Sequence, residues 1–170
     1  DEAYAKFTGS KTNIDAAKKY LAEKDKLTAI QVKQLEYILF LAGNNPETAG
    51  EIIKKRIDAT NAQTEKLFGF KYTLNGKEVS PNAIDEILRT SNDMNQRLAA
   101  WNSSKEVGKT LKDGLANLQA LRNQSVTPLG YKDFFDYMAS EYSMSSEEML
   151  ELTHSMITDV WPLYRELHTW

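Results

Sequence analysis

The spacing of apolar residues along the 170-residue chain predicts a mainly helical protein. In most segments apolar residues recur every three or four positions, which is the spacing of one helix face. Gly43 follows one such segment and is expected to end it in a left-handed conformation. Helices are predicted at residues 13–24, 28–42, 45–68, 81–89, 92–101, 105–126, 131–141 and 145–170. The first, which begins at Asn13 or Asp15, carries Ile14, Ala17, Tyr20 and Leu21. The second is expected to turn Ile30, Leu35, Ile38, Leu39 and Ala42 inward.

One segment, at about residues 70–79, departs from the helical pattern. Apolar and polar residues alternate from Phe70 to Leu74, Asn75-Gly76 follows, and the chain returns to Val79. Asn-Gly supplies the positive φ angles that a two-residue hairpin turn needs. Because two strands alone are marginally stable, the hairpin is expected to pack against helices. The fold class predicted is therefore mainly α, a multi-helix domain with one small β-hairpin.

The last predicted helix has a clear start and no visible stop. Ser145 and Glu148 have the spacing of a capping box, in which each side chain binds the other residue's backbone N–H. No Gly, Asn or terminal Lys or Arg closes the pattern, and Pro162 is expected to kink the helix. We therefore expect this chain to be a piece of a larger protein. The apolar stripe consists of Met149, Leu152, Met156, Val160, Leu163, Leu167 and Trp170.

Composition narrows the classes of function. The net charge of −3 and the lack of a basic stripe argue against nucleic-acid binding. The sequence holds no cysteine, which removes disulfides and thiol chemistry, and no apolar run long enough to span a membrane. Its two histidines, His154 and His168, would lie about 21 Å apart on a straight helix. They cannot share a metal there, and a surface or half-buried position is the favoured interpretation of each.

The remaining candidate residues favour structural roles. Glu147, Glu148 and Glu151 suit the first turn of a helix, where acids complement the helix dipole. An aromatic cluster has helical spacing and favours core packing over ligand stacking. Phosphate-loop, dinucleotide and nucleophile-elbow motifs are all missing from the sequence, and no catalytic, metal-binding or cofactor-binding residue is assigned. The aromatic cluster consists of Tyr131, Phe134, Phe135, Tyr137 and Tyr142.

A succession of short motifs gives the chain a family resemblance. These are FGFKYTLNGKEV at 68–79, IDEIL at 84–88, AAWNSSKEVG at 99–108, LQALRN at 118–123, Gly130-Tyr131, and WPLYRELH at 161–168. In this order and spacing they resemble bacterial members of the angiotensin-converting-enzyme family. These are zinc peptidyl-dipeptidases (dipeptidyl carboxypeptidases), which remove dipeptides from peptide C-termini. The likeness is good from about residue 68 to 170 and looser before that.

The resemblance implies an N-terminal fragment of a two-lobed metallopeptidase. Residues 1–170 would form a single helical unit, with lid-like helices at 1–67 and the hairpin and outer cleft wall at 68–170. The parent's zinc would be held by a later His-Glu-x-x-His motif and a further Glu, which this chain lacks, so the chain alone is expected to be inactive and to hold no cofactor. Animal members carry a chloride-binding Arg where this chain has Ala139, so that chloride site is expected to be missing.

The resemblance also implies partners. These are the parent's C-terminal half and its peptide substrates, with a periplasmic or secreted location favoured. Four residues, Leu163, Tyr164, Leu167 and Trp170, are the candidate interface, through which a homodimer is also expected if the later helices are absent. The alternative interpretation is a stand-alone helical module that binds a peptide or protein without enzymatic activity.

Overall fold

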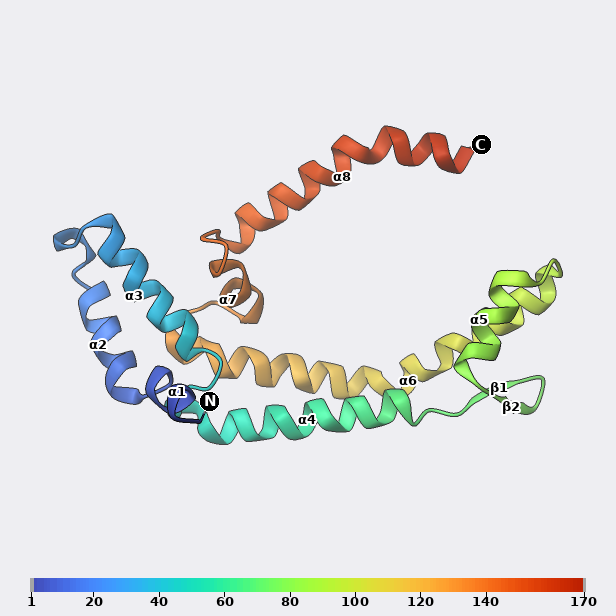
Figure 1. Ribbon diagram of the computed structural model, residues 1–170, viewed down its shortest axis with the longest axis horizontal. Coiled ribbons are helices and arrows are strands. Elements are labelled where there is room, and N and C mark those ends of the chain that lie inside the picture. The colour runs from blue at the N-terminus through green and yellow to red at the C-terminus, as the bar shows by residue number, and fades with distance from the viewer. Residues whose placement is uncertain (1, 170) are drawn as a thin grey trace. The chain divides into compact units, whose positions relative to one another are not determined.

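A computed structural model of the chain describes residues 2–169 (Figure 1). Most of these residues lie in helices, and one β-hairpin lies between two of the helices. The predicted fold class is confirmed. The chain divides into two compact units, one made of residues 1–53 and 122–170 and the other of residues 54–121. Two long helices, α4 (Gly50–Phe68) and α6 (Met94–Val126), have residues in both units.

The first unit packs its N-terminal helices around a small core. Its elements are α1 (Glu2–Thr8), α2 (Lys11–Leu21), α3 (Ala29–Ala42), 3-10 helices at Lys24–Lys26, Glu47–Ala49 and Thr127–Leu129, α7 (Phe134–Ser140) and α8 (Ser146–Thr169). Ile14, Ala17, Leu39, Ala42 and Leu129 form the core, with Leu21 and Leu35 packed against it. The inward prediction is wrong for Ile30 and Ile38, which are exposed, and Tyr20 on α2 is exposed as well. Helices α2 and α3 bury only part of their apolar residues against each other, and the rest of the apolar stripe is exposed.

Helix α3 begins as the sequence predicts and ends differently. Thr28 and Gln31 form a capping box, with the Thr28 N–H donating to Gln31 Oε1 at 2.9 Å. Gly43 follows with φ −61° and ψ −21°, so the predicted left-handed conformation is wrong. A Cβ at this position would lie 2.3 Å from Cε2 of Tyr137. Close approach of that ring, rather than backbone geometry, therefore requires glycine at position 43.

The N-terminal region differs from the prediction in two further places. Helix α1, at Glu2–Thr8, was not predicted, because a helix of 7 residues is too short to show a clear apolar period. Pro46 precedes a 3-10 helix at Glu47–Ala49, and α4 begins at Gly50 rather than at Asn45-Pro46. The Glu47 N–H donates to the Gly9 carbonyl at 2.8 Å, a contact between distant segments that fixes this entry into the helix.

The second unit contains the predicted hairpin. Strands β1 (Tyr72–Leu74) and β2 (Lys77–Val79) pair antiparallel, with Thr73 opposite Glu78. Asn75 and Gly76 have φ angles of 53° and 78°, which confirms the predicted turn. The Ser103 hydroxyl on α6 donates to the Thr73 carbonyl at 2.9 Å. The hairpin therefore has the helical support that its size requires.

Helix α6 is continuous where two helices were predicted. The sequence indicated a break near Asn102-Ser103-Ser104, but the helix runs from Met94 to Val126. The Ser103 hydroxyl is satisfied by the hairpin, and the Ser104 hydroxyl donates to the Trp101 carbonyl at 2.6 Å. The Ser103 hydroxyl is thus used outside the helix, while the Ser104 hydroxyl bonds back to the preceding turn, and the helix continues through both. Before it, α5 (Pro81–Thr90) starts at the expected Ser80 cap.

The capping box that starts α8 is confirmed. The Glu148 N–H donates to Ser145 Oγ at 3.1 Å, and the Ser145 N–H donates to Glu148 Oε2 at 2.8 Å. The helix continues through Pro162 to Thr169 and changes direction in its C-terminal half (Figure 1). No helix among residues 2–169 is long and apolar enough to cross a membrane.

Candidate functional site

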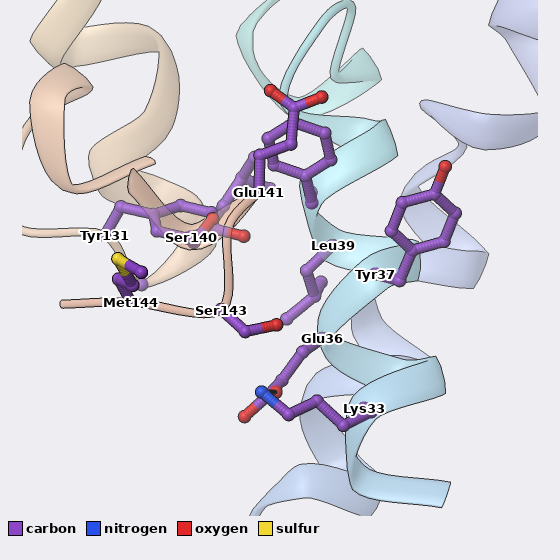
Figure 2. A pocket seen from close by; sticks show the side chains of 12 residues that line it. Lys33, Glu36, Tyr37, Leu39, Tyr131, Ser140, Glu141, Ser143 and Met144 are labelled. Carbon is purple, nitrogen blue, oxygen red and sulfur yellow. Dashed lines mark ion pairs between the residues drawn. The ribbon is translucent and has the colours of Figure 1, made fainter. Parts of the chain in front are cut away.

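A pocket of about 540 Å³ lies in the first unit, beside α3. Lys33, Glu36, Tyr37 and Phe40 line it from α3, at the spacing of one helix face. Two segments form the opposite side: Leu129–Tyr131, before α7, and Ser140–Met144, which joins α7 to α8. In Figure 2 the side chains of Lys33 and Glu36 extend from α3 toward this second side.

Tyr137 holds the two sides of the pocket together. Its hydroxyl donates to the Phe40 carbonyl at 3.1 Å and lies 3.4 Å from Oδ1 of Asn44. Its ring stacks on Phe40 with centroids 4.9 Å apart and meets the edge of Tyr131 at 5.2 Å. With only 2% of Tyr137 exposed, this residue is the anchor of α7 on α3.

The aromatic cluster thus packs as predicted only in part. Tyr137 is buried and Phe134 packs against it at 5.4 Å, while Phe135 and Tyr142 are exposed. Helix α7 buries only one of its faces, so the aromatic residues on the other face are exposed. The Phe134 N–H donates to Asn123 Oδ1 at 3.0 Å, so the end of α6 fixes the start of α7.

Two residues that line the pocket have positive φ angles. Gly130 has φ 108° and follows the 3-10 helix, while Ser143 has φ 57° in the connection to α8. Glycine adopts such angles without steric cost, and a serine does so only where its surroundings hold it. The backbone thus reverses at two points on the same side of the pocket.

The electrostatics of the pocket centre on Tyr131 and the α3 charges. Lys33 Nζ lies 3.7 Å from Glu36 Oε2. Burial raises the pKa of the Tyr131 phenol, the hydrogen bond with Ser140 opposes this, and the Asp136 and Glu36 carboxylates raise the pKa further. Tyr131 therefore holds its proton more tightly than a free phenol, and its hydroxyl and the Glu36 carboxylate line the same pocket. Together these groups provide a hydrogen-bond donor and charges of both signs for a polar ligand.

An exposed ion pair links the first turn of α8 to the segment just before α7. Lys132 Nζ lies 3.3 Å from Glu147 Oε1. The pKa of Glu147 is lowered by its backbone N–H, by the Ser146 hydroxyl and by Lys132. Glu147 thus acts in the first turn, as the sequence predicted, by accepting backbone and neighbouring donors.

The second candidate binding surface is the exposed side of α8. From Leu150 to Thr169 every side chain is exposed. In the predicted interface, Leu163 and Leu167 are 61% and 69% exposed and Tyr164 is about half exposed. Trp170 lies outside the described residues. Exposed apolar area of this extent on one helix marks an interaction surface.

Both histidines lie on α8 in exposed positions, and the ring of His168 is 4.1 Å from that of Tyr164. Within residues 2–169, no group of three or more His, Cys, Asp or Glu side chains is placed to hold a metal ion. Ala139, where the resemblance expects arginine in chloride-dependent relatives, is buried on α7 with 2% exposed.

Sequence reasoning missed two surfaces. The first is the polar pocket beside α3, which depends on segments about 100 residues apart. The second is an apolar groove of about 310 Å³ between α1, α2 and α3, lined by Phe7, Ala17, Tyr20, Leu35, Ile38 and Leu41 among others. The apolar periodicity that wrongly predicted Ile38 to face inward was the available sign of this groove.

Among the described residues the structure therefore has a polar pocket beside α3 and a long helix, α8, with exposed apolar side chains. The sequence model of the angiotensin-converting enzyme family, peptidase family M2, matches residues 4–170. The chain belongs to that family. No solved structure gives a significant match to the chain.

Proposed function

We propose that this chain is the N-terminal, non-catalytic portion of a zinc metallopeptidase that removes C-terminal dipeptides from peptides. The observation that carries the proposal is the family match over residues 4–170, together with a sequence that contains no His-Glu-x-x-His. In this proposal a later segment supplies the zinc ligands and the general base, while residues 1–170 supply lid helices and one wall of the cleft.

The pocket beside α3 suits such a wall. It offers the protonated hydroxyl of Tyr131, the ammonium of Lys33 and the carboxylate of Glu36 on an apolar floor that includes Leu39. Peptide backbone and side-chain groups are bound by sparse polar groups of this kind set among apolar ones. A periplasmic or secreted location is part of the same proposal, and so is a weak response of the parent to chloride at Ala139.

A second function, a stand-alone helical module that binds a peptide or protein, is favoured by the exposed apolar face of α8. Sequencing the reading frame beyond the codon for Trp170 separates the two. An in-frame His-Glu-x-x-His followed by a further Glu supports the peptidase portion. A stop codon directly after Trp170 contradicts it and supports the module.

A further inference from the structure

The turn of the β-hairpin places a side-chain amide next to an unbonded backbone nitrogen. Asn75 and Gly76, the two residues of the turn, are both exposed. The strand pairing ends with Leu74 opposite Lys77, so the Gly76 N–H lies outside the ladder, and it forms no hydrogen bond with any described residue. The space in which a side chain at Gly76 would begin is open to 4 Å. The Gly76 nitrogen is therefore unobstructed for attack on the amide of Asn75.

The other asparagines of the chain are followed by nitrogens that are less available. Seven of the eleven asparagines lie in helices, where the next N–H donates to an earlier carbonyl or to a capping side chain. Asn45 precedes Pro46, which has no N–H. The N–H groups that follow Asn44 and Asn92 donate hydrogen bonds of 3.2 and 3.1 Å. Because a bonded nitrogen must first give up its hydrogen bond, Asn75 differs from all the others.

The backbone of the turn is one rotation away from the geometry that ring closure needs. With φ angles of 53° at Asn75 and 78° at Gly76, the turn is of type I′. In a type II′ turn the first residue keeps its positive φ, and the peptide unit between the two residues is turned over. This rotation brings the Gly76 nitrogen toward Cγ of Asn75, and glycine accepts the negative φ that results. Both turn types close two-residue hairpins, so the strands stay paired.

We propose that Asn75 is a site of spontaneous modification through a cyclic imide, formed within the folded hairpin. Base removes the proton of the Gly76 nitrogen, which then bonds to Cγ of Asn75. The bond from Cγ to Nδ2 breaks, and the side-chain nitrogen leaves as ammonia. Water opens the ring: opening at Cγ gives aspartate, and opening at the backbone carbonyl of residue 75 gives isoaspartate, whose main chain runs through Cγ. The sum consumes one water and releases one ammonia, with no oxidant or reductant.

The two products affect the hairpin differently. Aspartate tolerates a positive φ, so this product keeps the turn and adds a negative charge next to Lys77. Isoaspartate adds an atom to the backbone of a turn whose length sets the strand register. That change disturbs the pairing of Thr73 with Glu78 and the hydrogen bond of 2.9 Å from the Ser103 hydroxyl on α6 to the Thr73 carbonyl. The isoaspartyl chain is therefore expected to be the less stable product.

Incubation of the pure chain at neutral and at mildly alkaline pH tests the site. After digestion under acidic conditions, mass spectrometry detects the change from amide to acid, and an isoaspartyl-specific carboxyl methyltransferase detects the isoaspartyl product. Asn75 should convert ahead of every other asparagine, and faster at the higher pH. Asn92, also outside the helices but followed by a bonded N–H, is the control within the same sample. Gly76→Asn accepts a positive φ but puts a side chain beside the attacking nitrogen, so it should slow conversion of Asn75 severalfold.

Two comparisons test whether the reaction takes place in the folded hairpin. A synthetic peptide of residues 70–80 lacks α6 and gives the rate of the unconstrained sequence. The folded chain should convert within about tenfold of that rate, since only one peptide unit has to rotate. Ser103→Ala removes the hydrogen bond between α6 and the hairpin. It should leave the rate of conversion unchanged if the hairpin does not have to open.

The products are compared by thermal unfolding after chromatographic separation. The isoaspartyl chain should melt below the unmodified chain, whereas Asn75→Asp, made directly, should melt close to it. The proposal is overturned if Asn75 stays intact over the time in which the peptide converts, or if Asn92 converts as fast as Asn75. It is equally overturned if Ser103→Ala speeds conversion by about tenfold or more, because opening of the hairpin would then control the reaction. An isoaspartyl chain that melts with the unmodified one would overturn the expected effect on the hairpin.

Discussion

The ring of Tyr137 occupies the space in which a side chain at Gly43 would begin. The position of a Cβ on Gly43 lies 2.3 Å from Cε2 and 2.8 Å from Cζ of Tyr137. The Tyr137 hydroxyl donates to the carbonyl of Phe40, one turn earlier on α3. Helix α7 therefore docks on the end of α3 through the Tyr137 ring. This contact uses the Phe40 carbonyl as a hydrogen-bond acceptor and requires that residue 43 has no side chain. That docking closes one side of the pocket.

Gly43→Ala should consequently destabilise the first unit by about 1–3 kcal/mol, the usual cost of forcing an extra carbon into a packed site. Urea unfolding monitored by circular dichroism measures the change. Gly50→Ala is the matched control, because Gly50 is also right-handed and nothing lies within 4 Å of its Cβ position. Equal stability of the two variants would show that the Tyr137 ring moves aside at no cost.

Gly76→Val should destabilise the chain by about 1 kcal/mol or more, because valine is strained at the φ of 78° that Gly76 adopts. Thermal unfolding gives the effect as a lower melting temperature. Gly108→Ala, in open space within α6, is the control and should be neutral or stabilising. An unchanged melting temperature for Gly76→Val would mean that the turn does not constrain the fold.

Structural features that depend on only a few neighbouring residues were predictable from the sequence. The Asn75-Gly76 turn and the box of Ser145 and Glu148 are local, and the structure has both. The reason for glycine at position 43 was not predictable, since it is the ring of Tyr137, almost a hundred residues away. The continuity of α6 likewise depends on Ser103 finding the carbonyl of Thr73.

The candidate interface was predictable from the sequence, and the pocket was not. A stripe containing Leu163 and Leu167 is visible in the sequence because a helix face is periodic. The pocket combines α3 with the segments around Tyr131 and Ser143, and no spacing rule relates positions so far apart. Periodicity also overstates the core, as the exposed side chain of Ile30 shows. It measures how amphipathic a helix is and does not say which partner covers the apolar face.

The pure 170-residue chain should bind no stoichiometric zinc and release no dipeptides, because its sequence lacks the His-Glu-x-x-His motif that would hold zinc in the proposed parent. Elemental analysis after dialysis against zinc, and mass spectrometry of a peptide digest, measure both. One tightly held zinc per chain, or cleavage that a chelator stops, would contradict this expectation. The chain denatured by heat and repurified is the control for a contaminating peptidase.

The stability of the first unit should fall at alkaline pH because of Tyr131. Burial raises the pKa of this phenol in the folded chain, while in the unfolded chain it ionises near its ordinary value. The folded state therefore holds the proton more tightly. Its stabilising contribution is complete below the unfolded pKa and is lost as the pH rises through the folded pKa. Urea midpoints at pH about 8 and about 10.5 bracket the start of this loss.

Tyr131→Phe removes the ionisable group and should reduce the alkaline loss of stability, whereas Tyr37→Phe, an exposed position of the same pocket, should not. Carbon-13 NMR of tyrosine Cζ follows the titration of Tyr131 itself. Because the Glu36 carboxylate adds to the effect of burial, Glu36→Gln should lower the pKa of Tyr131, and Glu51→Gln, outside the pocket, should leave it in place. An identical Tyr131 titration in wild type and Glu36→Gln would show that the α3 charge does not reach the phenol. The two sides of the pocket would then be electrostatically independent.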